Sequence, residues 1–148
     1  MTIQERLTEA MKEAMKAKES LRLNTIRMAR TAIKNREIDA RAELTEQEAI
    51  AVLSTLVKQR REAAEAYRGG SREDLAVKEE QELAVIQEFL PAQLDEAGIR
   101  ELIEKAVLET GAASMKDMGK VMKVVSAQTT GRADGRLVSE LVKARLAG

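Results

Sequence analysis

The chain has 148 residues, enough for one ordinary domain or two small ones, and its 25 basic and 25 acidic side chains cancel in net charge. Because it contains neither cysteine nor histidine, disulfides, thiol or imidazole catalysts, and zinc sites built from those ligands are excluded. Tyr67 and Phe89 are its only aromatic side chains, too few for a platform on which single-stranded nucleic acid could stack.

The first ninety residues predict four helices, at about 3–17, 21–40, 46–68 and 72–90. Apolar side chains recur there at helical spacing, and strong helix formers dominate the composition. Thr2, Thr45 and Ser71 each precede an acidic residue by three positions, which is the spacing of a capping box. The apolar positions expected to face inward include Ile3, Leu7, Met11, Ala14, Met15, Ile26, Ala29, Ile33, Ile38, Leu53, Val57, Ala64, Tyr67, Leu83 and Ile86.

The only proline, Pro91, interrupts the helical pattern, so we predict that Phe89–Leu94 is a linker. Three shorter helices follow, at about 96–109, 115–130 and 135–147. Since no segment alternates with period two, the predicted fold class is all-α. It comprises an N-terminal helical bundle of about four helices in residues 1–90 and a C-terminal three-helix tail domain in residues 91–148.

No apolar stretch approaches the length of a membrane span, and the first residues lack the pattern of a secretory or transit leader. Together with the missing cysteines, this predicts a cytoplasmic location.

Charge is distributed unevenly. Residues 1–72 carry 15 basic and 11 acidic side chains, residues 73–109 carry 3 and 11, and residues 110–148 carry 7 and 3. Such polarity fits either of two uses: it steers an anionic partner to the basic ends, or it reflects salt bridges between segments of the chain.

No catalytic group or cofactor site is predicted. The chain lacks a phosphate-binding loop and a dinucleotide fingerprint, and Glu79, Glu80 and Glu82 fit a solvated acidic face better than a metal site. Among the basic residues near the N-terminus, three recur at helical spacing and are either phosphate contacts or a solvated face: Arg27, Arg30 and Lys34.

The sixth predicted helix has a cationic ridge. At about 100° per residue, Lys116, Lys120 and Lys123 fall on one face. The opposite face is apolar and holds Met118, Val121, Met122 and Val125. Gly119 costs about 1 kcal/mol relative to alanine inside a helix, so we expect another helix or a ligand to approach it closely.

A turn with two arginines follows this helix. Gly131 has the place of a left-handed helix exit, and Asp134 that of the next N-cap. Arg132 and Arg136 flank the turn, and the amides at the start of the last helix are a potential anion site. For the lysines and these arginines, RNA binding and simple solvation both fit the pattern.

These residues resemble a known family signature. Asp117-Met118-Gly119-Lys120-Val121-Met122, followed by Gly131-Arg132-Ala133-Asp134-Gly135-Arg136-Leu137-Val138, is similar to the tail signature of the GatB/YqeY family. The segments Glu88–Leu94 and Leu23–Ile38 resemble its linker and its N-terminal helical region, and the match is to the stand-alone YqeY-like form. Within the signature, Asp117, Gly119, Met122, Gly131, Asp134 and Gly135 are expected to be structural.

The resemblance implies a link to glutamine-dependent tRNA amidotransferases, in whose B subunit a related tail helps to hold the tRNA. It also carries the label of a carbon–nitrogen ligase with glutamine as amido donor, although the chain has no residues for activation or ammonia transfer. The leading hypothesis is a tRNA-binding accessory module that uses Lys116, Lys120, Lys123, Arg132 and Arg136. The alternatives are a protein-interaction module that docks on an amidotransferase or synthetase, and the ligase itself.

Overall fold

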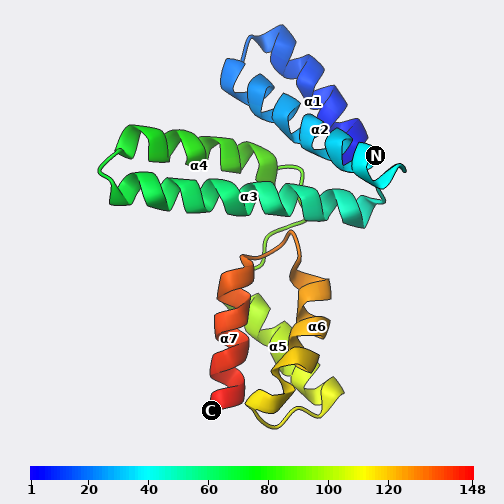
Figure 1. The fold of residues 1–148 in the computed structure, drawn as a ribbon, viewed down its shortest axis with the longest axis vertical. Helices are drawn as coiled ribbons and strands as arrows, with labels where there is room; N and C mark the ends of the chain where they lie inside the picture. Colours follow the sequence, from blue (N-terminus) through cyan, green and yellow to red (C-terminus); the bar gives the residue numbers. More distant parts are fainter. The chain divides into compact units, whose positions relative to one another are not determined.

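The computed structural model describes residues 1–148, and every regular element in it is helical, so the all-α prediction is confirmed. The elements are α1 Ile3–Ala17, α2 Ser20–Ala40, α3 Glu46–Gly69, α4 Glu73–Gln87, α5 Glu96–Thr110, the short 3₁₀ helix η1 Met115–Asp117, α6 Met118–Thr129 and α7 Gly135–Ala147. The chain divides into two compact units (Figure 1): Met1–Pro91 contains α1 to α4, and Ala92–Gly148 contains α5 to α7.

Most predicted helix starts are formed by side-chain caps. The Thr2 hydroxyl accepts the backbone N–H of Glu5 at 3.1 Å, and Thr45 and Glu48 form a complete capping box. A cap was also predicted at Ser71, and this is wrong. Because α3 runs through Gly69, the chain reverses at Ser71, whose backbone is left-handed (φ 61°), and α4 begins without a side-chain cap.

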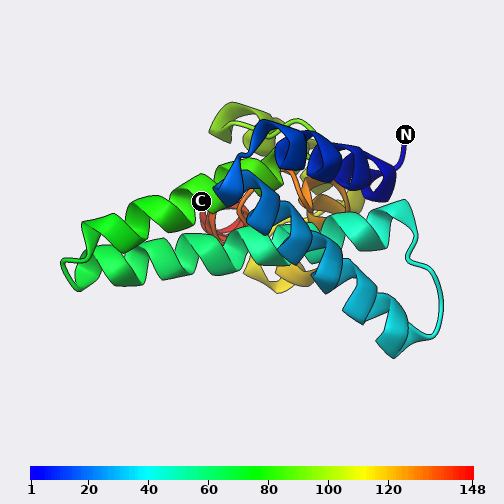
Figure 2. The same ribbon diagram turned by 90° about the horizontal axis from the view of Figure 1, so that it is seen from above.

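Unit 1 is built from two helix pairs. Figure 2 shows the α1–α2 pair lying across α3 and α4, which run side by side as a hairpin. The core between the pairs contains Leu7, Ile26, Leu53 and Ile86, none more than 1% exposed. Burying such aliphatic side chains contributes roughly 1.5–3 kcal/mol each and fixes how the pairs pack.

The linker is shorter than predicted. Phe89 and Leu90 are buried in the core of unit 1, while Leu94 packs against the core of unit 2. Apolar side chains next to the proline are therefore used for packing, and only Pro91, Ala92 and Gln93 lie outside both cores.

Three side chains predicted to face inward are instead exposed: Met15 is 48%, Ile38 63% and Tyr67 37% exposed. Each lies two residues before the end of its helix. The helical period of the sequence extends into these last turns, but the packing does not.

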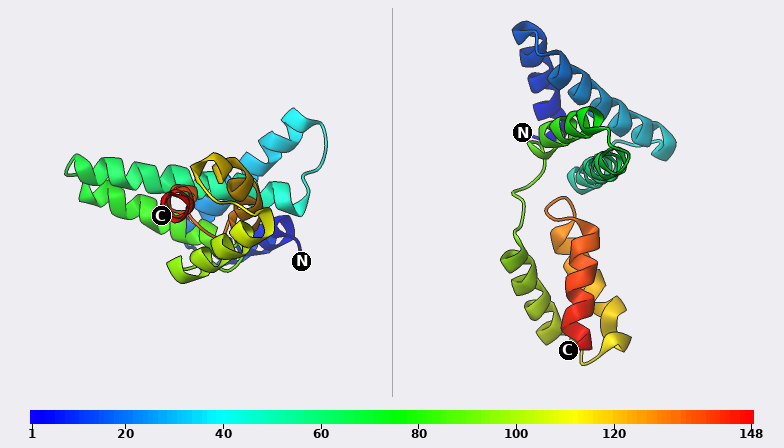
Figure 3. Two further views of the ribbon diagram at one scale, coloured as in Figure 1. Left: turned by 90° about the horizontal axis from the view of Figure 1, so that it is seen from below. Right: turned by 90° about the vertical axis from the view of Figure 1, so that its left-hand side faces the viewer.

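Unit 2 is a three-helix unit in which α5, α6 and α7 each contact the other two (Figure 3). Its core contains Ile99, Ile103, Val121, Val125 and Val142. One buried polar side chain, Thr129, is satisfied locally, because its hydroxyl donates to the Val125 carbonyl at 3.0 Å.

Candidate nucleic-acid interface

The three lysines of the predicted ridge are exposed on one stretch of unit 2. Lys116 lies in η1, while Lys120 and Lys123 lie three residues apart in the first half of α6. Val121 and Val125 on the opposite side of α6 have no exposed surface. The lysines can therefore meet a ligand without involving the core.

The helix that the sequence placed at 115–130 is interrupted at its start. The Ser114 hydroxyl and the Asp117 carboxylate form a capping box around η1, so the regular α-helix begins only at Met118. A 3₁₀ turn advances about 120° per residue against about 100° in an α-helix. Lys116 is thus rotated away from the line through Lys120 and Lys123.

Asp117 holds the loop that precedes α6. Its carboxylate accepts the backbone N–H groups of Ala113 at 2.9 Å and Ser114 at 3.4 Å, and the Lys120 ammonium lies 4.0 Å away. These two backbone hydrogen bonds, aided by the charge of Lys120, lower the pKa of Asp117. The carboxylate therefore stays ionised at neutral pH and keeps the loop in place.

Ion pairing separates the acidic segment from the lysines. Eight of the eleven carboxylates in residues 73–109 pair with arginine or lysine: Glu73, Asp74, Glu80, Glu82, Glu88, Glu96, Glu101 and Glu104. Lys116 and Lys123, in contrast, have no carboxylate within ion-pair distance. The acidic segment is largely neutralised within the molecule, while the ridge keeps its charge for solvent or a ligand.

The turn after α6 is tied to the chain that precedes α5. The Arg132 guanidinium donates to the carbonyls of Ala92 at 3.2 Å and Gln128 at 3.5 Å. The Leu94 N–H donates to the Arg132 carbonyl at 2.7 Å, and the Gln93 amide donates to the Gly131 carbonyl at 2.8 Å. The sequence analysis missed this set of contacts, because no local pattern pairs residues about forty positions apart.

Gly131 has the left-handed backbone that the sequence predicted, with φ 78°. Asp134 caps α7, and its carboxylate accepts the Arg136 N–H at 3.1 Å. The predicted anion site at this helix start is therefore already occupied by a carboxylate of the chain. Arg136 is exposed, but the two arginines lie at the far end of α6 from Lys116, a span of roughly 18 Å at 1.5 Å per residue.

Gly119 does not mark a close helix contact, and that prediction is wrong. A Cβ built on Gly119 would meet no atom within 4 Å, and the same holds for Gly135. Both glycines lie in the first turn of a helix, where the backbone faces solvent. Met122 is half-buried and packs against the core of unit 2.

No group of three or more carboxylates in the chain is arranged to hold a metal ion. None of the helices combines the length and the apolar character needed to cross a membrane.

Comparison with known proteins gives one family. A family model described as "Yqey-like protein" matches residues 4–146. Similar curated proteins share the name "Altered inheritance of mitochondria protein 41, mitochondrial". The protein from Vanderwaltozyma polyspora is 38% identical over 123 residues, covering 76% of this chain and 64% of the relative. The one from Lachancea thermotolerans is 31% identical, covering 89% and 74%, and the one from Pyrenophora tritici-repentis is 32% identical, covering 93% and 77%. The chain thus spans just under two thirds of the first of these proteins.

These relatives overturn the predicted cytoplasmic location, since their names place them in mitochondria. The prediction leaned on the missing cysteines. Cysteine usage reports the redox state of a compartment and does not separate the cytosol from another reducing compartment.

Proposed function

The chain belongs to the YqeY-like protein family, and from that premise we propose that it binds the phosphate backbone of structured RNA, tRNA foremost, as an accessory module in tRNA amidotransferase chemistry. Lys116, Lys120 and Lys123 make the central phosphate contacts. Arg136 contacts the backbone beyond the far end of α6, and Arg132 holds the intervening turn in position.

The contrast in ion pairing carries this proposal. The three lysines are exposed, and only Lys120 has a carboxylate nearby, at 4.0 Å. A lysine that neutralises a phosphate releases a condensed counterion, and this gain is available only when the ammonium is not already paired within the protein.

The proposed recognition is of backbone shape. With only Tyr67 and Phe89 as aromatics, and Phe89 buried, the chain cannot hold splayed bases by aromatic stacking. Double-helical RNA is recognised mostly by shape and by phosphate and 2′-hydroxyl contacts, which lysines on a helix can supply. In this proposal the tail domain folds separately, and the four-helix N-terminal part acts as a bundle beside it.

The two alternative functions have less support. Docking on a synthetase or amidotransferase through the acidic segment would need free carboxylates, and eight of eleven there are already paired. A carbon–nitrogen ligase activity rests on the resemblance alone. We expect the purified chain not to transfer an amide from glutamine to aminoacylated tRNA.

A competition experiment tests the proposal. Labelled tRNA is bound to the full chain and displaced by unlabelled tRNA, by an unstructured RNA of equal length, or by duplex DNA. We expect structured RNA to compete best, because the contacts follow the backbone of a folded helix. Equal competition by the unstructured strand, or no binding of tRNA at moderate salt, would contradict backbone-shape recognition.

A further inference from the structure

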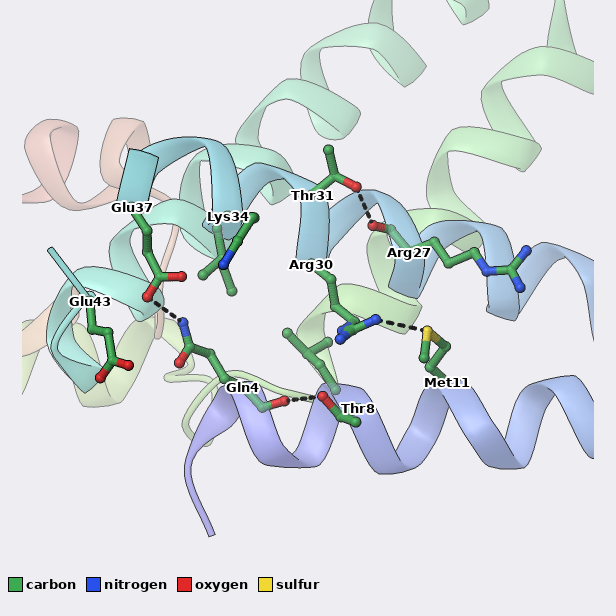
Figure 4. Close-up of a pocket in the computed structure, with 11 residues that line it drawn as sticks. Gln4, Thr8, Met11, Arg27, Arg30, Thr31, Lys34, Glu37 and Glu43 are labelled. Carbon is green, nitrogen blue, oxygen red and sulfur yellow. Dashed lines mark hydrogen bonds between the residues drawn. The ribbon is translucent and has the colours of Figure 1, made fainter. Parts of the chain in front are cut away.

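A groove between α1 and α2 lies in unit 1, well separated in the sequence from the lysine ridge. Its volume is about 640 Å³, within the range of small-molecule sites. Figure 4 shows side chains from both helices facing it. The apolar part of its lining is Leu7, Met11 and Ile33, of which Leu7 and Ile33 are buried.

Three cations on α2 line this groove, and none of them has a carboxylate partner. Arg27 and Lys34 are exposed, and neither is in an ion pair. Arg30 is half-buried, and its guanidinium contacts the Met11 sulfur at 3.0 Å. Other arginines of unit 1, such as Arg22 and Arg68, are paired with carboxylates.

These cations are the donors that the middle of the groove offers to an anion. The Thr8 hydroxyl donates to the Gln4 carbonyl at 3.0 Å, and the Thr31 hydroxyl donates to the Arg27 carbonyl at 2.9 Å. Both hydroxyl hydrogens are therefore already used. An anionic group in this part of the groove is left with the guanidinium and ammonium groups.

The other end of the groove is rich in acceptors. The Glu37 carboxylate accepts the Leu44 N–H at 3.0 Å and the Gln4 amide at 3.2 Å, which holds it in place. Glu43 lines the same end and is exposed, with no cationic partner. A ligand group that reaches this end must donate hydrogen bonds.

We propose that this groove binds a nucleotide unit whose base carries an exocyclic amino group. The phosphate lies against Arg27, Arg30 and Lys34, and the base lies over the apolar lining. Its amino group donates toward Glu43, as the amino group of cytosine does to carboxylates in nucleic-acid complexes. The planar guanidinium of Arg30 supplies the stacking surface that the missing aromatics do not.

An acidic peptide helix fits these features less well. Two turns of helix about 10 Å across fill roughly 850 Å³, more than the groove holds. Its carboxylates would also meet Glu37 and Glu43 at the far end. The inference does not rest on the proposed RNA backbone contact, since it uses other residues in the other unit.

The test is a titration of the full chain with cytidine monophosphate, uridine monophosphate, cytidine and inorganic phosphate, followed by backbone amide chemical shifts. We expect saturable shifts in α1 and α2, with cytidine monophosphate binding about tenfold tighter than each of the other three. The two nucleotides differ by the amino group, whose hydrogen bond to a charged acceptor is of this size. Equal affinities, or shifts confined to other helices, would overturn the proposal.

Three variants sharpen the result. R27Q/K34Q removes two exposed, unpaired cations of the groove and should weaken cytidine monophosphate binding at least tenfold. The control K12Q/K58Q removes two exposed cations elsewhere in unit 1 and should not. E43Q should abolish the preference for cytidine over uridine monophosphate. An equal loss in the control, or an unchanged preference in E43Q, would count against the assignment.

Two further arms identify the source of the nucleotide and separate the two proposals. An oligonucleotide that begins with a 5′-phosphorylated cytidine displaces the monophosphate if an RNA end is the ligand, and leaves it bound if a free metabolite is. K116Q/K120Q/K123Q should keep full nucleotide binding even if it loses tRNA. An acidic helical peptide that occupies the groove while cytidine monophosphate does not would refute the nucleotide assignment.

Discussion

Replacing Arg132 by glutamine should loosen unit 2 and leave RNA binding nearly unchanged. The variant loses the guanidinium hydrogen bonds to the Ala92 carbonyl at 3.2 Å and the Gln128 carbonyl at 3.5 Å. It keeps the backbone hydrogen bond from the Leu94 N–H to the carbonyl of residue 132. A hydrogen bond to a charged group contributes about 1.5–3 kcal/mol, but one of these is long and both are accessible to water. We therefore expect a loss of about 1 kcal/mol in the free energy of unfolding.

A loss of that size should lower the melting temperature of a unit this small by roughly 4–8 °C. The assay is thermal unfolding of the full chain followed by circular dichroism, with tRNA affinity measured at several salt concentrations. Lys143→Gln is the matched control, because Lys143 is an exposed cation on α7 without an ion pair. If the Arg132 variant melts with the wild type while its salt slope falls by about one unit, Arg132 is a phosphate contact and not a structural tie.

Three further predictions concern the tail. Gly119→Ala should be neutral or stabilise the protein by up to about 1 kcal/mol in chemical denaturation, because a Cβ meets no atom within 4 Å and alanine favours the helix; a large loss would mean that the site is crowded. A fragment of residues 92–148 should give a helical circular dichroism spectrum, since its core is internal; a disordered fragment would show that it depends on the N-terminal unit. The pKa of Asp117 is lowered in the fold, so its contribution to stability is present above its usual pKa near 3.8 and is lost as pH falls through the lowered value. The stability difference between wild type and Asp117→Asn should accordingly shrink in acid, and a difference that persists at the lowest pH would contradict this origin.

Local rules predicted most of what is local in this fold. The helix periods, the caps at Thr2 and Thr45, and the left-handed Gly131 all follow from side-chain chemistry within a few residues. Predictions failed where distant packing decides the outcome. Ile38 has helical phase but is exposed, and Gly119 has the composition of a contact site but open space around it.

The candidate site divides in the same way. The exposure of Lys120 and Lys123 follows from helix phase, because Val121 and Val125 must face the core. The role of Arg132 does not, because its acceptor at Ala92 is reached only after the chain has folded back. The pairing of the acidic segment was one of two alternatives that net charge left open, and side-chain geometry was needed to choose between them.

The salt dependence of tRNA binding by K116Q/K120Q/K123Q, measured beside the wild type, tests the central claim most directly. Each lost phosphate contact should reduce the slope of log affinity against log salt by about 0.7–0.9, so the triple variant should lose about two to three units. Its melting temperature should not change, since the three side chains are exposed and remote from the core. A control, K12Q/K58Q/K78Q, removes three exposed lysines of unit 1 and should keep the wild-type slope. A folded triple variant with wild-type affinity and slope, or an equal loss in the control, would contradict the proposed RNA interface.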